Sequence, residues 1–170
     1  GSIASVPINN DRRKVLVGTK GSEILELSTL DESDVNKGAL VTGHCRGRLC
    51  ALACHPILAE FATAGDDATL RLWDVATHAQ LRSLKLEEAA RAIGFMPNGH
   101  LIGVGLGAEE AATSKTGLVL VVSTLKPSLE VVKELKDTVA AISAIQFSPD
   151  GECMAAAACD TKIYVYDTLN

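Results

Sequence analysis

Apolar and polar residues alternate along much of the chain, in short runs that turn residues separate. In Thr69–Asp74, leucines alternate with threonine and arginine, and the run follows the acidic turn Gly65-Asp66-Asp67 and closes with Trp-Asp. A period of two residues is the pattern of a half-buried β-strand. Because no segment carries the period of a long amphipathic helix, the sequence predicts an all-β protein.

The run that ends in Trp73-Asp74 recurs at a nearly constant interval. Its counterparts end at Leu27-Ser28, Val122-Ser123 and Tyr166-Asp167, in steps of 46, 49 and 44 residues. A second marker, a proline beside a turn between two apolar runs, occurs in the same order at His55-Pro56, Met96–Gly99 and Ser148–Gly151. Proline fixes one dihedral of such a turn and glycine accepts a positive φ. Intervals of about 40–45 residues are those of the four-stranded blades of a WD40-type β-propeller.

We therefore predict a partial WD40-type β-propeller of about four antiparallel four-stranded blades. The blades span residues 3–43, 44–86, 87–135 and 136–170, and the last one lacks its outer strand. The expected strands are part of 3–6, then 14–18, 23–27 and 39–42; 49–54, 60–64, 69–74 and 80–84; 91–95, 101–105, 118–123 and 128–133; and 141–147, 153–158 and 162–167. Just under four blades cannot close a ring. The isolated fragment is therefore expected either to self-associate through its open blade faces or to stay curved and open.

Four polar residues of the second blade fall where WD repeats place a hydrogen-bonded tetrad: His44, Thr63, Asp67 and Trp73. Their imidazole, hydroxyl, carboxylate and indole N–H groups can satisfy one another. The same residue types also suit a hydrolase, but each has a structural partner in the repeat, and we predict a stabilising role. The fourth blade keeps Asp160 and has Tyr166 at the tryptophan position, with Ala156 in place of the hydroxyl residue.

Other motifs give no credible catalytic, cofactor or metal site. Residues 103–108 match the dinucleotide fingerprint G-x-G-x-x-G/A, but only about ten residues separate them from the next expected strand and no acidic residue lies near 20 positions on. We interpret them as a glycine-rich strand leading into a loop, and keep a nucleotide-dependent enzyme as a third hypothesis. The five cysteines form no CxxC pair, and we expect buried free thiols in a reducing cytoplasm.

Net charge narrows the classes of partner. The chain carries a formal net charge of −5, which argues against a nucleic-acid or anionic-membrane surface. No transmembrane segment or signal peptide is visible. The sequence therefore predicts a non-enzymatic protein that binds other proteins and needs no cofactor.

Several strings resemble the echinoderm microtubule-associated-protein-like (EMAP-like) family. Residues 14–27, KVLVGTKGSEILEL, are similar to that family's VLVGTKxxEIxEV pattern. Residues 43–56, GHCRGRLCALACHP, are similar to its GHxxGELWGLAxHP, and residues 90–99, ARAIGFMPNG, to its ARAxxFSPDG. In this chain Arg48 and Cys50 stand where an acidic residue and a tryptophan are usual in the family.

The resemblance implies a scaffold that acts on tubulin and the microtubule cytoskeleton, including cilia, and hence a cytoplasmic, cytoskeletal location. Because tubulin is acidic and this chain is net negative, a shape-specific contact is expected rather than simple charge attraction. The candidate contact residues are the loop residues Arg46, Arg48, Asp66, His78 and Asn98. The alternative is a generic WD-repeat scaffold of another intracellular complex, such as one in trafficking or a ubiquitin ligase.

Overall fold

The computed structural model describes residues 3–6, 13–19, 24–31, 33, 44, 47–107 and 117–168. Every helix or strand assigned within these residues is a β-strand. The chain divides into two compact units, residues 1–46 and 47–170. The all-β class predicted from the alternating pattern is confirmed.

The first unit holds one antiparallel sheet with the strand order β1-β2-β3. Its strands are β1 (Ile3–Ser5), β2 (Lys14–Thr19) and β3 (Ile24–Ser28). Within this sheet the side chain of Val17 is buried. The fourth strand predicted for this blade, residues 39–42, lies outside the described residues, as does the loop predicted at 108–115.

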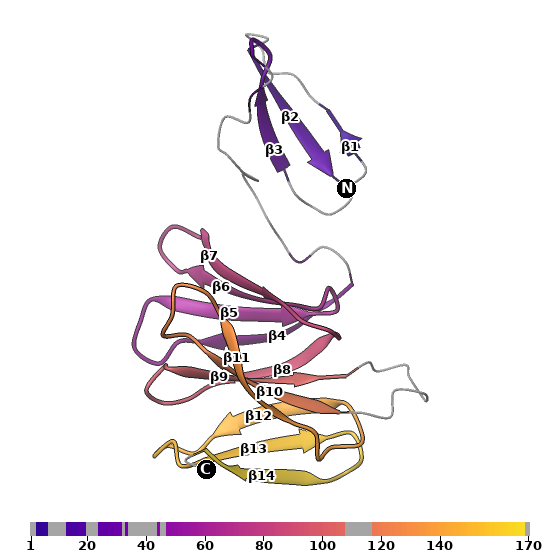
Figure 1. Ribbon diagram of the computed structural model, residues 1–170. Coiled ribbons are helices and arrows are strands. Elements are labelled where there is room, and N and C mark those ends of the chain that lie inside the picture. Colours follow the sequence, from indigo (N-terminus) through magenta and orange to yellow (C-terminus); the bar gives the residue numbers. More distant parts are fainter. Residues whose placement is uncertain are drawn as a thin grey trace. The chain divides into compact units, whose positions relative to one another are not determined.

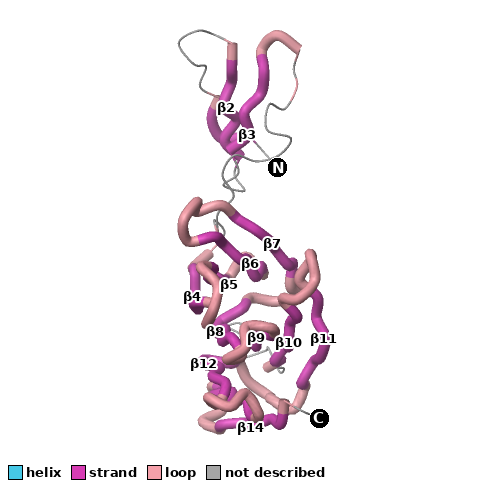
Figure 2. Tube along the Cα trace, turned by 90° about the vertical axis from the view of Figure 1, so that its left-hand side faces the viewer, coloured by secondary structure: helices cyan, strands magenta, loops and turns pink. Residues whose placement is uncertain are grey.

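The second unit consists of three antiparallel sheets stacked face to face (Figure 1). We call them blades two, three and four. Their strands are β4 (Leu49–Cys54), β5 (Glu60–Gly65), β6 (Thr69–Asp74) and β7 (Gln80–Lys85); β8 (Ala90–Phe95), β9 (Leu101–Leu106), β10 (Leu118–Ser123) and β11 (Glu130–Leu135); and β12 (Ile142–Phe147), β13 (Cys153–Ala158) and β14 (Ile163–Asp167). Seen from the side, β4, β8 and β12 follow one another along one side of the stack, with β7 and β11 on the other (Figure 2).

The predicted bounds of β4, β6, β10 and β13 match the observed bounds. The largest difference is at β11, which begins at Glu130 rather than at residue 128. Pro127 has no N–H to give to the ladder, and the side chain of Leu129 is buried in the core. Pairing with β10 therefore starts only at Glu130, opposite Ser123.

The core lies between the blades, in two separate apolar clusters. The first joins blades two and three and includes Leu70, Leu72, Ile102 and Val104. The second joins blades three and four and includes Val119, Ile142, Ile145, Phe147 and Met154. Each sheet buries alternate side chains against its neighbour, because successive residues of a strand point to opposite faces.

The glycines of β9 set how closely blades three and four pack. A Cβ on Gly103 would stand 2.8 Å from Met154 Sδ, and one on Gly105 would stand 2.5 Å from Ile142 Cγ2. A Cβ on Gly94 in β8 would likewise stand 2.8 Å from the backbone oxygen of Ile145. The glycine-rich motif therefore makes room for blade four, which accounts for it without a dinucleotide.

The two glycine turns predicted from Pro-Asn-Gly and Pro-Asp-Gly are confirmed. Gly99 has a φ of 73° and Gly151 a φ of 76°, which is the left-handed region that glycine tolerates best. The N–H of Gly99 donates to the Met96 carbonyl at 2.8 Å, and that of Gly151 to the Ser148 carbonyl at 2.9 Å. Both turns close the hairpin between the first two strands of a blade.

Candidate functional site

A side-chain hydrogen bond links the Trp-Asp strand of blade two, β6, to β5. Trp73 Nε1 donates to Thr63 Oγ1 at 2.7 Å, and the Thr63 side chain is buried. The indole also stacks on Phe61, with ring centroids 6.2 Å apart and planes 12° apart. The register of β5 and β6 pairs Phe61 with Trp73 and so places these groups on one face.

Asp67, at the turn before β6, is held by residues that follow it in the chain. Its carboxylate accepts from the Thr69 N–H at 3.2 Å and from Thr69 Oγ1 at 2.9 Å. It also forms an ion pair with Arg71 Nη2 at 3.3 Å, and both side chains of that pair are largely buried. Arg71 was not anticipated as part of this cluster. His44 is half-buried and belongs to the first unit, so its place in the tetrad stays a prediction.

Blade four repeats this arrangement with a tyrosine. Tyr164 Oη donates to Asp160 Oδ2 at 2.7 Å, four residues on from the aspartate, as Arg71 is from Asp67. This bond lowers the pKa of Asp160 and raises the pKa of Tyr164. The hydroxyl of Tyr166, which stands at the tryptophan position, is buried without a hydrogen-bond partner in the described part of the chain.

Replacing Thr63 with valine is expected to lower the free energy of unfolding by about 1 kcal/mol. The change keeps the side chain's shape but leaves the indole N–H of Trp73 without its acceptor. Urea unfolding followed by circular dichroism measures the loss. Trp73→Phe in the Thr63→Val background is the control. If Trp73→Phe lowers the free energy of unfolding as much in that background as in the original chain, the Trp73–Thr63 hydrogen bond contributes nothing to stability.

Two of the predicted contact residues, Arg48 and Asp66, meet at the end of the blades where β4 begins. One carboxylate oxygen of Asp66 accepts from the backbone N–H of Arg48 at 3.0 Å and lies 3.5 Å from its Nε. The other oxygen lies 3.3 Å from Nη2 of Arg91 in blade three and accepts from Cys50 Sγ at 3.5 Å. Arg91 in turn donates from Nε to the carbonyl of Gly107 at 3.2 Å. We call Arg48, Asp66 and Arg91 the arginine cluster.

The donors around Asp66 keep it ionised. The pKa of Asp66 is lowered, chiefly by the backbone hydrogen bond from Arg48, although burial opposes the shift. The pKa of the Cys50 thiol is raised by burial and by the same carboxylate. Gly47, with a φ of 84°, brings the chain so close to Asp66 that no side chain fits there. The cluster is therefore a fixed carboxylate between two guanidinium groups.

The other predicted contact residues lie elsewhere. His78, with a φ of 58°, is in the turn between β6 and β7, and Asn98 is in the turn between β8 and β9. Asn98 Oδ1 accepts from the His100 N–H at 2.9 Å, so its side chain shapes the turn. Because alternate strands run in opposite directions, both turns lie at the opposite end of the blades from the arginine cluster. Arg46 lies outside the described residues.

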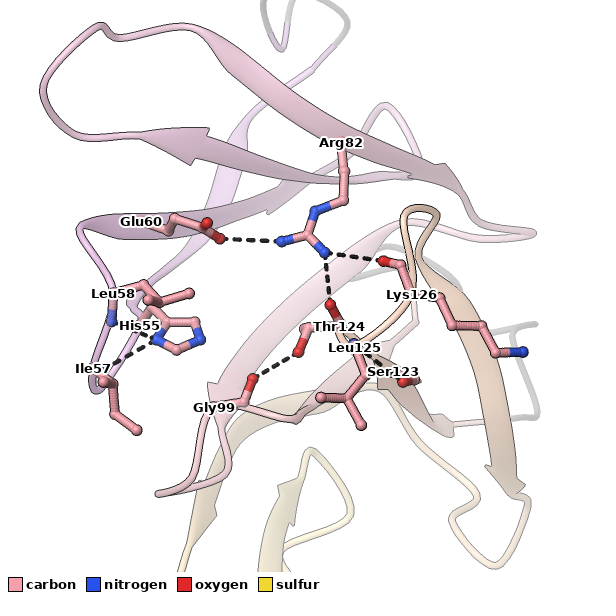
Figure 3. A network of polar contacts seen from close by, with 10 residues as sticks. All are labelled: His55, Ile57, Leu58, Glu60, Arg82, Gly99, Ser123, Thr124, Leu125 and Lys126. Carbon is pink, nitrogen blue, oxygen red and sulfur yellow. Dashed lines mark hydrogen bonds and ion pairs between the residues drawn. The ribbon is translucent and has the colours of Figure 1, made fainter.

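At that opposite end, Arg82 of β7 connects blade two to blade three (Figure 3). It forms an ion pair with Glu60 Oε2 at 3.1 Å and donates from Nη1 to the carbonyls of Thr124 at 2.6 Å and Lys126 at 3.2 Å. Thr124 Oγ1 donates to the Gly99 carbonyl at 2.7 Å. Sequence reasoning missed this contact because its groups are 22 to 44 residues apart.

The expectation of buried thiols is wrong for most of the described cysteines. Cys54, Cys153 and Cys159 are exposed, and Cys50 is half-buried, all as free thiols. Within the described residues no helix is long and apolar enough to cross a membrane. No three His, Cys, Asp or Glu side chains in that same part gather as metal ligands would.

The chain is similar in sequence and in fold to several known proteins. The family described as "Echinoderm microtubule-associated protein second beta-propeller" matches residues 49–170. The chain is 35% identical over 150 residues to "Echinoderm microtubule-associated protein-like 2" of Mus musculus, covering 88% of this chain and 21% of that protein. It is 32% identical over 168 residues to "Echinoderm microtubule-associated protein-like 3" of Homo sapiens, covering 96% and 18%.

A third relative is the "77 kDa echinoderm microtubule-associated protein" of Lytechinus variegatus, 33% identical over 75% of this chain and 18% of that protein. The chain thus spans about a fifth of the length of the relatives it matches. A chain of the "Crystal Structure of Mitotic Checkpoint Complex" has a TM-score of 0.65 and 16% identity, over 99% of this chain and 51% of that one. That likeness concerns the fold alone. With the stacked antiparallel sheets, two of four strands and one of three, these findings confirm a partial β-propeller.

Proposed function

Because this chain belongs to the echinoderm microtubule-associated protein-like family, we propose that it is a non-catalytic protein-binding scaffold that engages tubulin or a cytoskeletal complex. The observation that carries the proposal is the match of residues 49–170 to the second β-propeller of that family. The relatives that match this chain in sequence are named as microtubule-associated proteins. A cytoplasmic, cytoskeletal location, including cilia, is part of the proposal.

The polar clusters of the blades support a binding role over a catalytic one. Thr63 and Trp73 bond to each other, and Asp67 bonds to Arg71 and Thr69, so these groups stabilise the sheet. Exposed Ile163 and Val165 on β14 support the further proposal that the isolated chain self-associates through an open blade face.

The test is co-sedimentation of the full chain with stabilised microtubules, together with size exclusion on unpolymerised tubulin. We expect the chain to pellet or co-elute at tens of micromolar. Both partners are acidic, so attraction between net charges cannot drive the complex. Binding should therefore change little between about 50 and 150 mM salt, over which the screening length falls toward about 8 Å.

A WD-repeat propeller from an unrelated complex, at the same concentration, is the matched control for nonspecific pelleting. Absence of any complex at tens of micromolar in both assays would overturn the tubulin proposal. Binding that disappears at 150 mM salt would show instead that local charge, and not shape, makes the contact.

A further inference from the structure

Within the described residues, blade four has one strand fewer than the two blades it stacks with. Blades two and three each end in a fourth strand, β7 and β11, whereas the sheet of blade four has the order β12-β13-β14. Blade three therefore extends one strand beyond β14. Blades two and three have equal numbers of strands, so neither overhangs the other in this way.

A recess of about 400 Å³ lies under this overhang. Blade three lines it with Leu101, Val121, Val132 and Leu135, and the end of β14 lines it with Tyr166 and Thr168. The recess continues the interface between blades three and four, because Val121, Leu135 and Tyr166 also pack against the second apolar cluster. Its volume is within the range of ligand pockets, roughly 300–1,000 Å³.

The aliphatic wall of the recess is open to solvent. Val132 is 56% exposed, and Val121 and Leu135 are half-buried. A β-bulge gives Val132 its position: β11 pairs Lys133 with Val121 but Val131 with the next residue of β10, so Val132 has no partner in the ladder. An apolar side chain that enters the recess therefore meets carbon that is otherwise in contact with water.

The edge of β14 beside the recess presents backbone hydrogen-bonding groups. Lys162 and Thr168 flank this strand and bond on the β13 side, where the Lys162 carbonyl accepts at 3.0 Å and the Thr168 N–H donates at 2.9 Å. Since backbone groups alternate in direction along a strand, those of Ile163 and Val165 point away from β13. No strand in the described part of the chain pairs with β14 on that side. Such an edge is a template for adding a strand.

The interface between blades two and three shows what fits in the corresponding place. Leu129 directly precedes β11, and its side chain is only 4% exposed, within the apolar cluster that joins those two blades. A strand added beside β14 would place an apolar side chain in the recess in the same way. A symmetric pair of β14 strands from two copies does not fit, because β11 of one copy and blade three of the other would need the same space.

We propose that the edge of β14 and this recess bind an extended segment of a partner protein as the fourth strand of blade four. The segment carries an apolar side chain of about the size of leucine, which lies against Val132 and Leu135 in the recess. Its backbone bonds to the outward groups of Ile163 and Val165. The inference rests on the proposed protein-binding role but not on tubulin. A chain that pellets with microtubules and binds no such segment refutes this site alone, and the reverse result refutes the tubulin proposal alone.

The first experiment uses a fluorescent peptide that copies residues 128–135 of this chain, SLEVVKEL, and measures its binding to the full chain by anisotropy. One matched peptide has serine in place of its first leucine, and another has proline in place of both valines. We expect each to bind about tenfold or more weakly, because the first loses the apolar side chain and the second loses N–H donors. Equal binding of the three peptides, or no binding of the first at about 500 µM chain, would overturn the proposal.

The second experiment uses three variants of the chain. Val132→Glu places a charge in the recess, and Val165→Pro removes an outward N–H that an edge strand does not need for folding. Each should weaken binding of the first peptide about tenfold. Val131→Glu makes the same change of charge at a neighbouring residue that does not line the recess, and should leave binding unchanged. If it weakens binding as much as Val132→Glu does, charge repulsion explains the result and the site is refuted. Thermal melts check that each variant remains folded.

Amide hydrogen exchange locates the bound peptide. The peptide should slow exchange at Ile163 and Val165 several-fold and leave Ser83 and Lys85, at the outward positions of β7, unchanged. Equal slowing at both edges would mean that any open strand takes the peptide, which contradicts a specific site. Protection of Ile163 and Val165 that grows with the concentration of the chain alone would assign the edge to a second copy and overturn the partner segment.

Discussion

Replacing Gly105 with valine is expected to lower the free energy of unfolding by about 3 kcal/mol, the upper part of the usual range for overpacking a core. A Cβ at this position would lie 2.5 Å from Ile142 Cγ2 and 2.6 Å from Ile142 Cβ. Ile142 is itself fully buried, so it has no room to move away. Blade four would have to shift as a whole to admit the new side chain.

Urea unfolding followed by circular dichroism measures this loss, and a thermal melt should show a drop of about 10 °C. Ser83→Val is the matched control, because Ser83 is exposed in β7 and valine is well suited to a strand. The close packing of blades three and four would be contradicted if Gly105→Val were no more destabilising than Ser83→Val.

Replacing Arg82 with methionine is expected to lower the free energy of unfolding by about 2–3 kcal/mol. Methionine keeps most of the aliphatic stem, but three acceptors lose their donor: the Glu60 carboxylate and the carbonyls of Thr124 and Lys126. The Glu60 side chain is only 17% exposed, so its charge would be left poorly hydrated. Removing one partner of a largely buried ion pair costs more stability than replacing both, because the remaining charge is left unpaired.

A double-mutant cycle with Glu60→Gln isolates the ion pair from the carbonyl contacts. We expect Glu60→Gln to recover part of the stability lost in Arg82→Met. Lys126→Met is the control, since the Lys126–Glu130 pair is exposed and should contribute at most about 0.5 kcal/mol. If the losses of unfolding free energy caused by Arg82→Met and Glu60→Gln simply add, the ion pair contributes no coupling free energy between β7 and β5.

Strand positions were predictable because their signals are local. The alternation in Thr69–Asp74 needs no partner to be read, and Gly99 and Gly151 mark turns through their own conformational freedom. At β11 the local signal was ambiguous. An apolar run that begins beside Pro127 does not reveal that Leu129 belongs to the core before the ladder starts.

Contacts between blades were not predictable from the sequence. Asp66 and Arg91 are 25 positions apart, and Arg82 reaches backbone carbonyls more than 40 residues away. Such pairs depend on how the sheets stack, and repeats of unequal length do not determine which residues of neighbouring blades lie side by side. The same limit explains why the exposure of the thiols was predicted wrongly. Alternation places Cys54 on one face of β4 but does not say whether another sheet covers that face.

Within a blade, the donor to the turn aspartate could be read from the repeat. Alignment on the Trp-Asp position places Asp160 on Asp67 and Tyr164 on Arg71, so each aspartate has a donor four residues later. The same alignment places Tyr166 at the tryptophan position, and its hydroxyl has no partner within the described residues.

The stacking of the three blades also determines how cooperatively the second unit can unfold. β8 packs against β4 and β5 on one side and against β12 on the other, and a separate apolar cluster fills each interface. Such a stack behaves as a linear array in which stability is a sum of terms for each unit and each coupling between neighbours. Gly105→Val weakens one coupling and Arg82→Met the other. Each substitution thus moves the array toward a different partly folded state, in which an outer blade opens while the middle blade keeps its remaining neighbour.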